Sequence, residues 1–411
     1  MKNIVIVVTL DTKGPETKYV KELIEGQGHR VIVIDGACME GSFFEADYPA
    51  EYVAKLSGSK LEEVRAIPEA GAALKIMEKG AKIIAKELYE RGELDGIFGL
   101  GGGMNSTFAS AVMKELPVGV PKLLVSTKVG DPESPQFYVG DKDITLMPSI
   151  ADIAGLNKIT NQILANAAFA ISNMVNAPKI DESGKPTVVL SMIGLTTAFG
   201  LRVKSILEEK GYEVVVFHAM GIGGRCLEPF VAKDPDVVAV IEGCLWEIGN
   251  FLFGGMSNAG PHRLIEAGKK GLPQVIVPGA SAYIAFRGLE TVPEKYKNRP
   301  LHEHNPKATP MLLKPDEAKI AGETIAERLN KATGPVEVLI PTRGLGSLTG
   351  KEGTPFYKIE KELGSEKALI EGLKSKLSKN IPVKEVEAHI NDPEFADLVV
   401  ESFMRIRRQR S

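Results

Sequence analysis

The sequence predicts an α/β protein built from two tandem Rossmann-like, doubly wound domains with mainly parallel sheets. Short β-branched runs, such as 4–8 and 187–193, alternate with amphipathic helical patterns. This alternation is typical of parallel strands covered by helices on both faces. The chain of 411 residues is also longer than one hydrophobic core usually supports. We therefore expect an N-terminal nucleotide-binding domain over 1–180 and a C-terminal domain over 181–411.

The composition is that of a globular protein, with 44% hydrophobic residues, 25% charged residues and a net charge of −3. Such a balance gives no electrostatic footprint for nucleic acid. The apolar N-terminal run is too short to span a bilayer and lacks a signal-peptide cleavage region. Cys38, Cys226 and Cys244 share no spacing typical of disulfide frameworks or metal knuckles. These features predict a cytoplasmic protein that binds neither nucleic acid nor membrane.

The first half begins with a predicted strand at 4–8, and Pro15 opens a helix that ends at the glycines of 26–28. Further strands are predicted at 31–34, 94–98 and 123–127, with a mostly helical insertion over 40–90. A long helix over 159–175 precedes a polar linker at 176–185.

The second half repeats this order of elements. Strands are predicted at 187–193, 211–217, 237–241 and 272–280, and each corresponds to a predicted strand of the first half. Two more strands are expected at 336–340 and 383–388, followed by a closing helix over 394–406. A tandem pair of similar domains accounts for this pattern.

A glycine-rich loop follows the strand at 94–98, with four glycines among residues 99–103. Glycines let the backbone approach a ligand closely, and a helix start adds free N–H groups suited to phosphate. The loop matches neither a Walker A motif nor Gly-x-Gly-x-x-Gly, and a tight turn without ligand is the alternative. The candidate binding residues here are Gly101, Gly102, Gly103, Asn105, Ser106 and Thr107.

Polar residues also follow two other predicted strands, and the carboxyl ends of parallel strands share one edge of a sheet. Lys13 is a candidate to neutralise phosphate, and Asp11 to bind Mg²⁺ or a ribose hydroxyl. The alternative is a helix start capped by Asp11. The candidate residues after these strands are Thr9, Asp11, Thr12, Lys13, Ser126, Thr127, Gly130 and Asp131.

The second half contains a smaller candidate anion site. Gly223 and Gly224 precede Arg225 at a predicted strand-to-helix turn, and Ser257 and Gly260 belong to a second glycine-containing turn. Either segment is also compatible with a plain turn. The pair His302 and His304 has metal-like spacing, but no third ligand is close in sequence, so we expect no metal site.

Many of these motifs occur together, and in order, in a known family. The chain resembles the Tm-one-like ATP-binding domain family, an uncharacterised family named for the tomato mosaic virus resistance protein, over nearly its whole length. The resemblance implies two Rossmann-like domains, a homodimer, and ATP bound in the N-terminal domain. The motifs that carry it include 9–14, 125–127 with 130–131, 152–157, 221–224, 278–280, 304–306 and 389–392.

The chain departs from the family pattern at both candidate sites. Met104 and Asn105 stand where the family's loop has glycines, and Ala282 replaces an expected Asp. An expected Thr-Thr-Thr-Glu motif retains only Glu247, whose apolar neighbours are expected to raise its pKa. We therefore expect Glu247 to be the acid or base at a second, anionic ligand in the cleft between the domains, unless it only caps or pairs on a helix.

Three functions fit these observations. The first is an ATP-binding enzyme of unknown reaction, and the second is a regulatory or interaction module that holds nucleotide without turnover. The third is an enzyme that acts on a phosphorylated metabolite. A glycine loop recognises a phosphate group but does not determine which molecule carries it, so the sequence does not identify a substrate.

Overall fold

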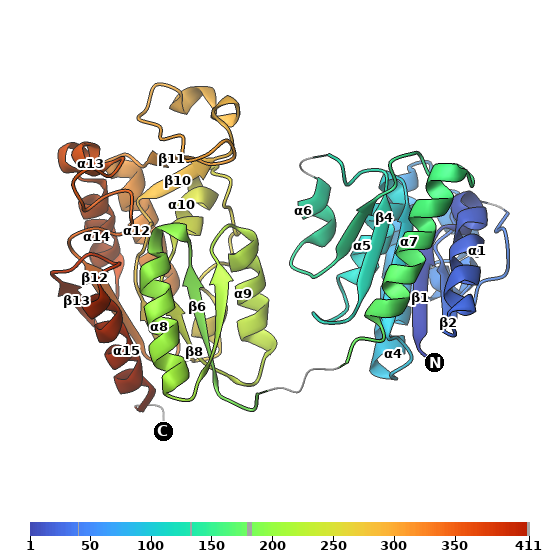
Figure 1. Cartoon of the computed structure of the whole chain (residues 1–411), viewed down its shortest axis with the longest axis horizontal. Coiled ribbons are helices and arrows are strands. Elements are labelled where there is room, and N and C mark those ends of the chain that lie inside the picture. Colours follow the sequence, from blue (N-terminus) through green and yellow to red (C-terminus); the bar gives the residue numbers. More distant parts are fainter. Residues whose placement is uncertain (40, 132–133, 179–182, 409–411) are drawn as a thin grey trace. The chain divides into compact units, whose positions relative to one another are not determined.

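The chain is described here by a computed structural model (Figure 1), which covers residues 1–39, 41–131, 134–178 and 183–408. It divides into two compact units, Met1–Ile180 and Asp181–Ser411. Each unit contains a parallel sheet with helices on both faces, so the predicted fold class is confirmed. The predicted linker at 176–185 and the boundary at 180 fall partly outside the described residues.

The first unit contains a five-stranded parallel sheet in the order β2-β1-β3-β4-β5. Residues of β1 alternate between two apolar cores: Val5 and Val7 pack on one face, and Ile4 and Ile6 on the other. The β-branched run at 4–8 is explained by this burial on both sides. The strands are β1 (Asn3–Val8), β2 (Arg30–Asp35), β3 (Gly96–Gly101), β4 (Lys122–Ser126) and β5 (Thr145–Pro148).

Helices α1 and α7 pack together on one face of this sheet, and α4 packs with α5 on the other. Leu164 of α7 belongs to the core with Ile4 and Ile6, and Phe108 of α5 to the core with Val5 and Val7. The helices are α1 (Leu10–Gly26), α2 (Ala50–Leu56), α3 (Leu61–Arg65), α4 (Ala70–Glu90), α5 (Gly103–Met113), α6 (Ser134–Val139) and α7 (Lys158–Met174).

The second unit has a six-stranded parallel sheet in the order β13-β12-β9-β8-β6-β7, and β10 pairs with β11 in a separate antiparallel ribbon. Its four strands β7-β6-β8-β9 repeat the order β2-β1-β3-β4 of the first unit. The strands are β6 (Thr187–Met192), β7 (Glu213–His218), β8 (Val237–Glu242), β9 (Gln274–Ile276), β10 (Tyr283–Phe286), β11 (Thr309–Leu312), β12 (Val336–Pro341) and β13 (Val383–Val386).

Helices α8 and α15 pack together and bury Phe199 and Phe395 against one face of the second sheet. Helices α12 and α14 pack on the opposite face with Ile325 and Leu373. The helices are α8 (Thr197–Glu209), α9 (Ile222–Lys233), α10 (Trp246–Phe253), α11 (Glu266–Lys269), α12 (Pro315–Leu329), α13 (Tyr357–Leu363), α14 (Ser365–Lys376) and α15 (Pro393–Arg407), with short 3₁₀ turns at Gly194–Thr196, Leu289–Thr291 and Glu294–Tyr296.

Three strands of the structure lack a prediction from the sequence: β5, β10 and β11. Strand β5 lies at the sheet edge, is exposed or half-buried along its length, and ends in Pro148. Strand β11 is buried but contains Pro310. Proline removes a backbone donor and weakens the strand signal in both. No helix in the described part of the chain is long and apolar enough to cross a membrane.

Candidate functional site

The first candidate site lies at the carboxyl ends of β1 and β3. These strands are neighbours in the sheet, while β2 lies beyond β1 and β4 beyond β3, so the chain winds in opposite directions from this point. In open α/β sheets, ligands bind in the crevice at such a switch point. The two loops that border it begin at Thr9 and at Gly102.

Asn105 connects the two loops. Its Oδ1 accepts a hydrogen bond of 3.0 Å from the Thr9 backbone N–H, and its Nδ2 lies 3.5 Å from Thr12 Oγ1. The Thr9 and Thr12 hydroxyls are 2.8 Å apart. The structure thus brings three of the predicted binding residues together. The resemblance implies a glycine at this position, and here the amide of Asn105 joins the two loops.

The start of α5 has no side-chain cap among the described residues, since Gly102 at its N-cap offers no side-chain oxygen. Gly101 has a φ of 147°, and an added Cβ would lie 2.4 Å from Asn105 Cβ, so glycine is required there. An added Cβ on Gly102 or Gly103 would meet its first neighbour only at 3.9 or 3.6 Å. The backbone above this helix end is therefore open to a ligand.

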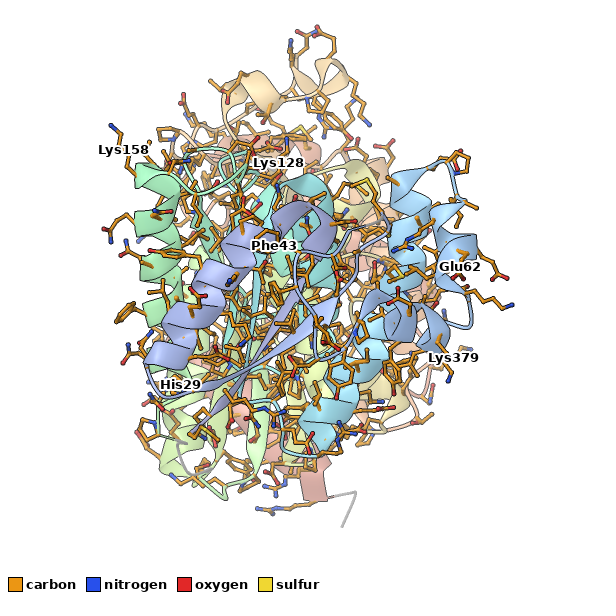
Figure 2. The ribbon with its side chains drawn as sticks, turned by 90° about the vertical axis from the view of Figure 1, so that its right-hand side faces the viewer. His29, Phe43, Glu62, Lys128, Lys158 and Lys379 are labelled. Atoms are coloured by element: carbon orange, nitrogen blue, oxygen red, sulfur yellow. The ribbon has the colours of Figure 1, made fainter. Side chains whose placement is uncertain are left out.

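Lys128 is a basic residue at this edge that the sequence analysis did not select. Its Cε lies 3.6 Å from the Cβ position of Gly103, and its backbone N–H donates to Ser126 Oγ at 3.0 Å. Ser126 is itself held by Ser106 at 2.7 Å. Figure 2 shows exposed Lys128 toward one end of the unit and His29, just before β2, toward the other. One indication of this role was present in the sequence, because Lys128 directly follows the candidate residues Ser126 and Thr127.

Other predicted residues contact different parts of the unit. The Lys13 ammonium donates to the Ile153 carbonyl, and Thr107 Oγ1 donates to the Gly103 carbonyl at 2.8 Å. Gly130 lies in the turn between β4 and α6, where Asp131 accepts a 3.0 Å hydrogen bond from Ser134. The Thr107 contact therefore stays within the glycine loop and the first turn of α5, whereas the contacts of Lys13 and Asp131 involve other segments.

Two carboxylates border the segment that follows β2. Asp11 Oδ2 accepts from the backbone N–H groups of Cys38 and Met39 at 3.1 and 2.9 Å. Asp11 Oδ1 is buried with no hydrogen-bond partner among the described residues. Asp35 is buried and accepts from the Leu10 N–H at 2.9 Å; its burial raises its pKa. Asp35 is therefore occupied within the protein, whereas Asp11 keeps one free acceptor.

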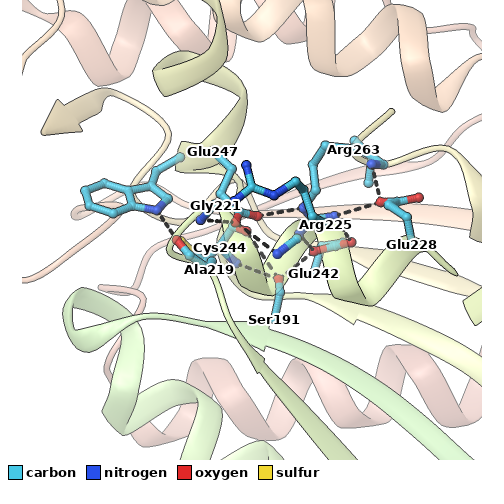
Figure 3. Close-up of polar contacts among 12 residues, drawn as sticks. Ser191, Ala219, Gly221, Arg225, Glu228, Glu242, Cys244, Glu247 and Arg263 are labelled. Atoms are coloured by element: carbon cyan, nitrogen blue, oxygen red, sulfur yellow. Dashed lines mark hydrogen bonds and ion pairs between the residues drawn. The ribbon is translucent and has the colours of Figure 1, made fainter. Parts of the chain in front are cut away.

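The second candidate site contains a buried ion network centred on Arg263 (Figure 3). This guanidinium is 1% exposed and makes two hydrogen bonds of 2.6 Å to the two carboxylate oxygens of Glu242. Its Nε donates to Glu247 at 2.8 Å, and its Nη1 lies 3.3 Å from Glu228. Three carboxylates thus surround a single cation, an arrangement that was not predicted.

Glu247 caps the start of α9 from inside this network. It is fully buried, and its Oε1 accepts from the N–H groups of Gly221 and Gly224 at 2.7 and 3.0 Å. Burial raises its pKa, while the Arg263 charge opposes that shift. Both oxygens are occupied, so proton transfer to a ligand would first require these contacts to open. The Gly224 N–H, predicted to bind an anion, is already used.

The remaining predicted residues of this site form a turn contact. Arg225 donates to the Asn258 carbonyl at 2.8 Å, which joins it to the turn that holds Ser257 and Gly260. Gly223 packs tightly, since an added Cβ would lie 1.8 Å from the His218 carbonyl oxygen. The structure therefore brings Arg225 to the 257–260 turn through a protein contact, and the predicted anion site stays a prediction.

The imidazoles of His302 and His304 have centroids 6.0 Å apart. Within the described ranges, no group of three or more His, Cys, Asp or Glu side chains is arranged to hold a metal ion.

Solved structures that resemble this chain include a Streptomyces sp. SF2575 glycosyltransferase complexed with thymidine diphosphate and MurG of Acinetobacter baumannii. The first is 15% identical, with a TM-score of 0.21 over 98% of this chain and 99% of that chain. The second is 12% identical, with a TM-score of 0.24 over 98% and 100%.

Curated relatives cover the chain more specifically. A protein of Clostridium tetani is 38% identical over 96% of both chains, and one of Rhizobium meliloti is 34% identical over 99% of both. The ToMV resistance protein Tm-1 of Solanum lycopersicum is 34% identical over 82% of this chain and 45% of its own length. This relative confirms the family resemblance seen in the sequence.

Family models match both units. The N-terminal domain model of the uncharacterised protein family UPF0261 matches residues 2–179, and its C-terminal domain model matches residues 185–407. Together with the relatives above, these matches show that the chain belongs to the uncharacterised protein family UPF0261.

Proposed function

We propose that the first unit binds ATP, with the phosphates over the start of α5. The observation that carries this proposal is the uncapped helix end at Gly102 and Gly103, located at the switch point between β1 and β3. A helix N-terminus presents free N–H groups and a partial positive charge, which suit a phosphate. The family resemblance, which implies ATP, supports the choice of nucleotide.

Side chains around this loop have defined roles in the proposal. Lys128 supplies a positive charge next to Gly103, and the hydroxyls of Thr12 and Thr127 line the same edge. Asp11 keeps a buried, unpartnered oxygen that suits Mg²⁺, a cation that prefers carboxylate ligands. Whether ATP is hydrolysed separates an enzyme from a regulatory module, and a phosphate-release assay on the full chain distinguishes them.

The homodimer, the cytoplasmic location and the second, anionic ligand stay predictions. The apolar run Phe251, Leu252 and Phe253 beside Gly254 is a candidate in the sequence for an exposed interface patch, but all three residues are half-buried. Leu252 and Phe253 pack against the core of the second unit, and Arg328 lies 5.9 Å over the Phe251 ring. The homodimer therefore rests on the resemblance, and light scattering at micromolar concentration tests it.

ATP with Mg²⁺ at 100 times its Kd is expected to stabilise the first unit by about 2.7 kcal/mol. Gly102→Val is expected to remove this stabilisation, because its side chain fills the space above α5. The fold tolerates the change, since Gly102 has a φ of −81° and open space around its Cβ position. Differential scanning calorimetry with and without nucleotide measures both effects.

The matched control is Gly26→Val, at the exposed end of α1, where an added Cβ meets nothing within 4 Å. This variant should keep the full response to ATP. The proposal fails if millimolar ATP with Mg²⁺ leaves the wild-type transition unchanged, or if Gly102→Val responds as strongly as Gly26→Val.

Lys128→Ala is expected to weaken ATP binding about 10-fold or more, since a hydrogen bond to a charged group contributes about 1.5–3 kcal/mol. Lys13→Ala is the comparison, because the Lys13 ammonium is engaged by the Ile153 carbonyl. Titration calorimetry at fixed salt measures both affinities. A larger loss for Lys13→Ala than for Lys128→Ala would contradict the assignment of Lys128.

A further inference from the structure

The second unit contains a pocket of about 830 Å³ that is distinct from the Arg263 network. It lies beyond the carboxyl ends of β12 and β13, between the segment that follows β12 and the helices α13 and α14. The carboxyl edge of a parallel sheet is where α/β proteins bind ligands. Pro341, Tyr357 and Ile370 give the pocket an apolar wall.

Glu366 presents one carboxylate oxygen to the protein and leaves the other free. Its Oε1 accepts hydrogen bonds from Tyr283 at 2.7 Å, from Thr349 at 2.5 Å and from the Leu345 N–H at 3.2 Å. Its Oε2 has no hydrogen-bond partner among the described residues, and Glu366 lines the pocket. Tyr283 is fully buried, so the contacted oxygen is fixed in position.

Glu360 is the second carboxylate of the pocket, and it caps the start of α14. It accepts from the N–H groups of Glu366 and Ser365 at 2.8 and 3.1 Å. Burial, reinforced by the charge of Glu366, raises the pKa of Glu360 to about 7. Burial also raises the pKa of Glu366, while the hydrogen bonds from Thr349 and Tyr283 and the charge of His389 oppose this shift. The two carboxyls are therefore close enough that the negative charge of Glu366 disfavours ionisation of Glu360.

Neither Glu360 nor Glu366 forms an ion pair with a described residue, whereas most other charges that line the pocket have a partner. Lys361, one residue from Glu360, lies 4.3 Å over the Tyr357 ring. The pairs formed by the remaining charges of the pocket are Lys374 with Glu385, Lys367 with Glu371, and Arg343 with Asp392. Glu360 and Glu366 are therefore the two acidic residues of the pocket that lack an ion-pair partner among the described residues.

We propose that this pocket binds a small organic amine, whose cationic group contacts Glu360 and Glu366 and whose apolar part lies against Tyr357 and Ile370. A cation beside a desolvated carboxylate favours the charged form and satisfies the free oxygen of Glu366. The pocket offers two carboxylates without an ion-pair partner, fewer oxygen ligands than a calcium site needs, and its volume suits an organic molecule. The proposal is independent of ATP binding in the first unit.

The test uses the full chain and three probes of equal length: pentylamine, pentan-1-ol and pentanoate. In titration calorimetry, pentylamine is expected to bind, whereas the alcohol and the carboxylate are not. Glu360→Gln is expected to weaken pentylamine binding about 10-fold or more. The matched control is Glu371→Gln, an exposed residue of the same pocket whose carboxylate is paired with Lys367.

The affinity for pentylamine is also expected to rise about 10-fold between pH 6 and pH 8. Below its pKa of about 7, Glu360 is mostly protonated and carries no charge to attract the amine. Binding at pH 6 must therefore first remove this proton, which weakens the affinity. Equal binding of the alcohol, an unchanged affinity in folded Glu360→Gln, or no pH dependence would overturn the proposal. Displacement of pentylamine by Ca²⁺ at constant ionic strength would do so as well, because it would indicate a metal site.

Discussion

Replacing Arg263 with methionine is expected to destabilise the second unit by about 3–5 kcal/mol. The change leaves three carboxylates without their cation, and two of them, Glu242 and Glu247, are at most 1% exposed. A buried charge without a partner costs far more than the lost contacts themselves. Trp246, the only tryptophan of the chain, is buried directly before Glu247 and donates to the Ala219 carbonyl, so its fluorescence during urea unfolding reports on this unit.

The deficit of Arg263→Met relative to wild type is expected to shrink as the pH falls from 8 to 5. Burial already raises the pKa of Glu247 with Arg263 present, and loss of that positive charge raises it further. When the pKa of a carboxyl is higher in the folded than in the unfolded state, its ionisation destabilises the fold. This cost begins above the unfolded-state pKa and is complete above the folded-state pKa. This cost disappears when the group is protonated in both states.

The matched control is Arg202→Met, which removes an exposed ion pair. In this pair, Arg202 donates two hydrogen bonds of 2.7 Å to the carboxylate of Asp397. Exposed pairs contribute about 0–1 kcal/mol, so this variant should stay close to wild type. Arg263→Lys should fall between the two, because an ammonium keeps the charge but loses the two-pronged contact with Glu242. A deficit below about 1 kcal/mol in Arg263→Met, or one that is constant with pH, would contradict the buried network.

The fold could be predicted because buried parallel strands leave a local signal. The alternate residues of 4–8 enter two different cores, so the whole run is apolar, and the same holds for residues 188–190 of β6. Edge and ribbon strands lack this signal: β5 is largely exposed, and Pro310 interrupts β11. Local sequence therefore predicts central strands better than peripheral ones.

Side-chain partners could not be predicted in the same way, because they depend on contacts between distant segments. Asn105 was selected for its polarity, but its link to Thr9 spans 96 residues and requires β1 and β3 to be neighbours. Lys13 and Lys128 both follow strands, and only the structure shows that Lys128 lies beside Gly103. Glu247 looked available for chemistry until its oxygens were seen to bind protein groups.

Gly223 shows how a glycine selected as an anion donor has a different role in the structure. Gly223→Ala is expected to destabilise the second unit by about 2 kcal/mol. In a helix interior, alanine stabilises by about 1 kcal/mol relative to glycine, and at Gly223, the second residue of α9, the gain is at most that large. Here the added Cβ would lie 1.8 Å from the His218 carbonyl oxygen and 2.6 Å from its carbon. Overpacking against a backbone that cannot rotate away costs about 1–3 kcal/mol or more, so the clash outweighs the gain.

Gly249→Ala is the matched control, since Gly249 lies in α10 of the same unit and an added Cβ would meet Ile284 at 3.4 Å, an ordinary contact. That variant should unfold at the same urea concentration as wild type, or a higher one, because the gain in helix propensity acts without a clash. Trp246 fluorescence follows both variants. If Gly223→Ala matched Gly249→Ala, α9 would have room to move away from His218. Gly223 would then be free of packing constraints, and a direct role of its backbone in binding a ligand would again explain the glycine.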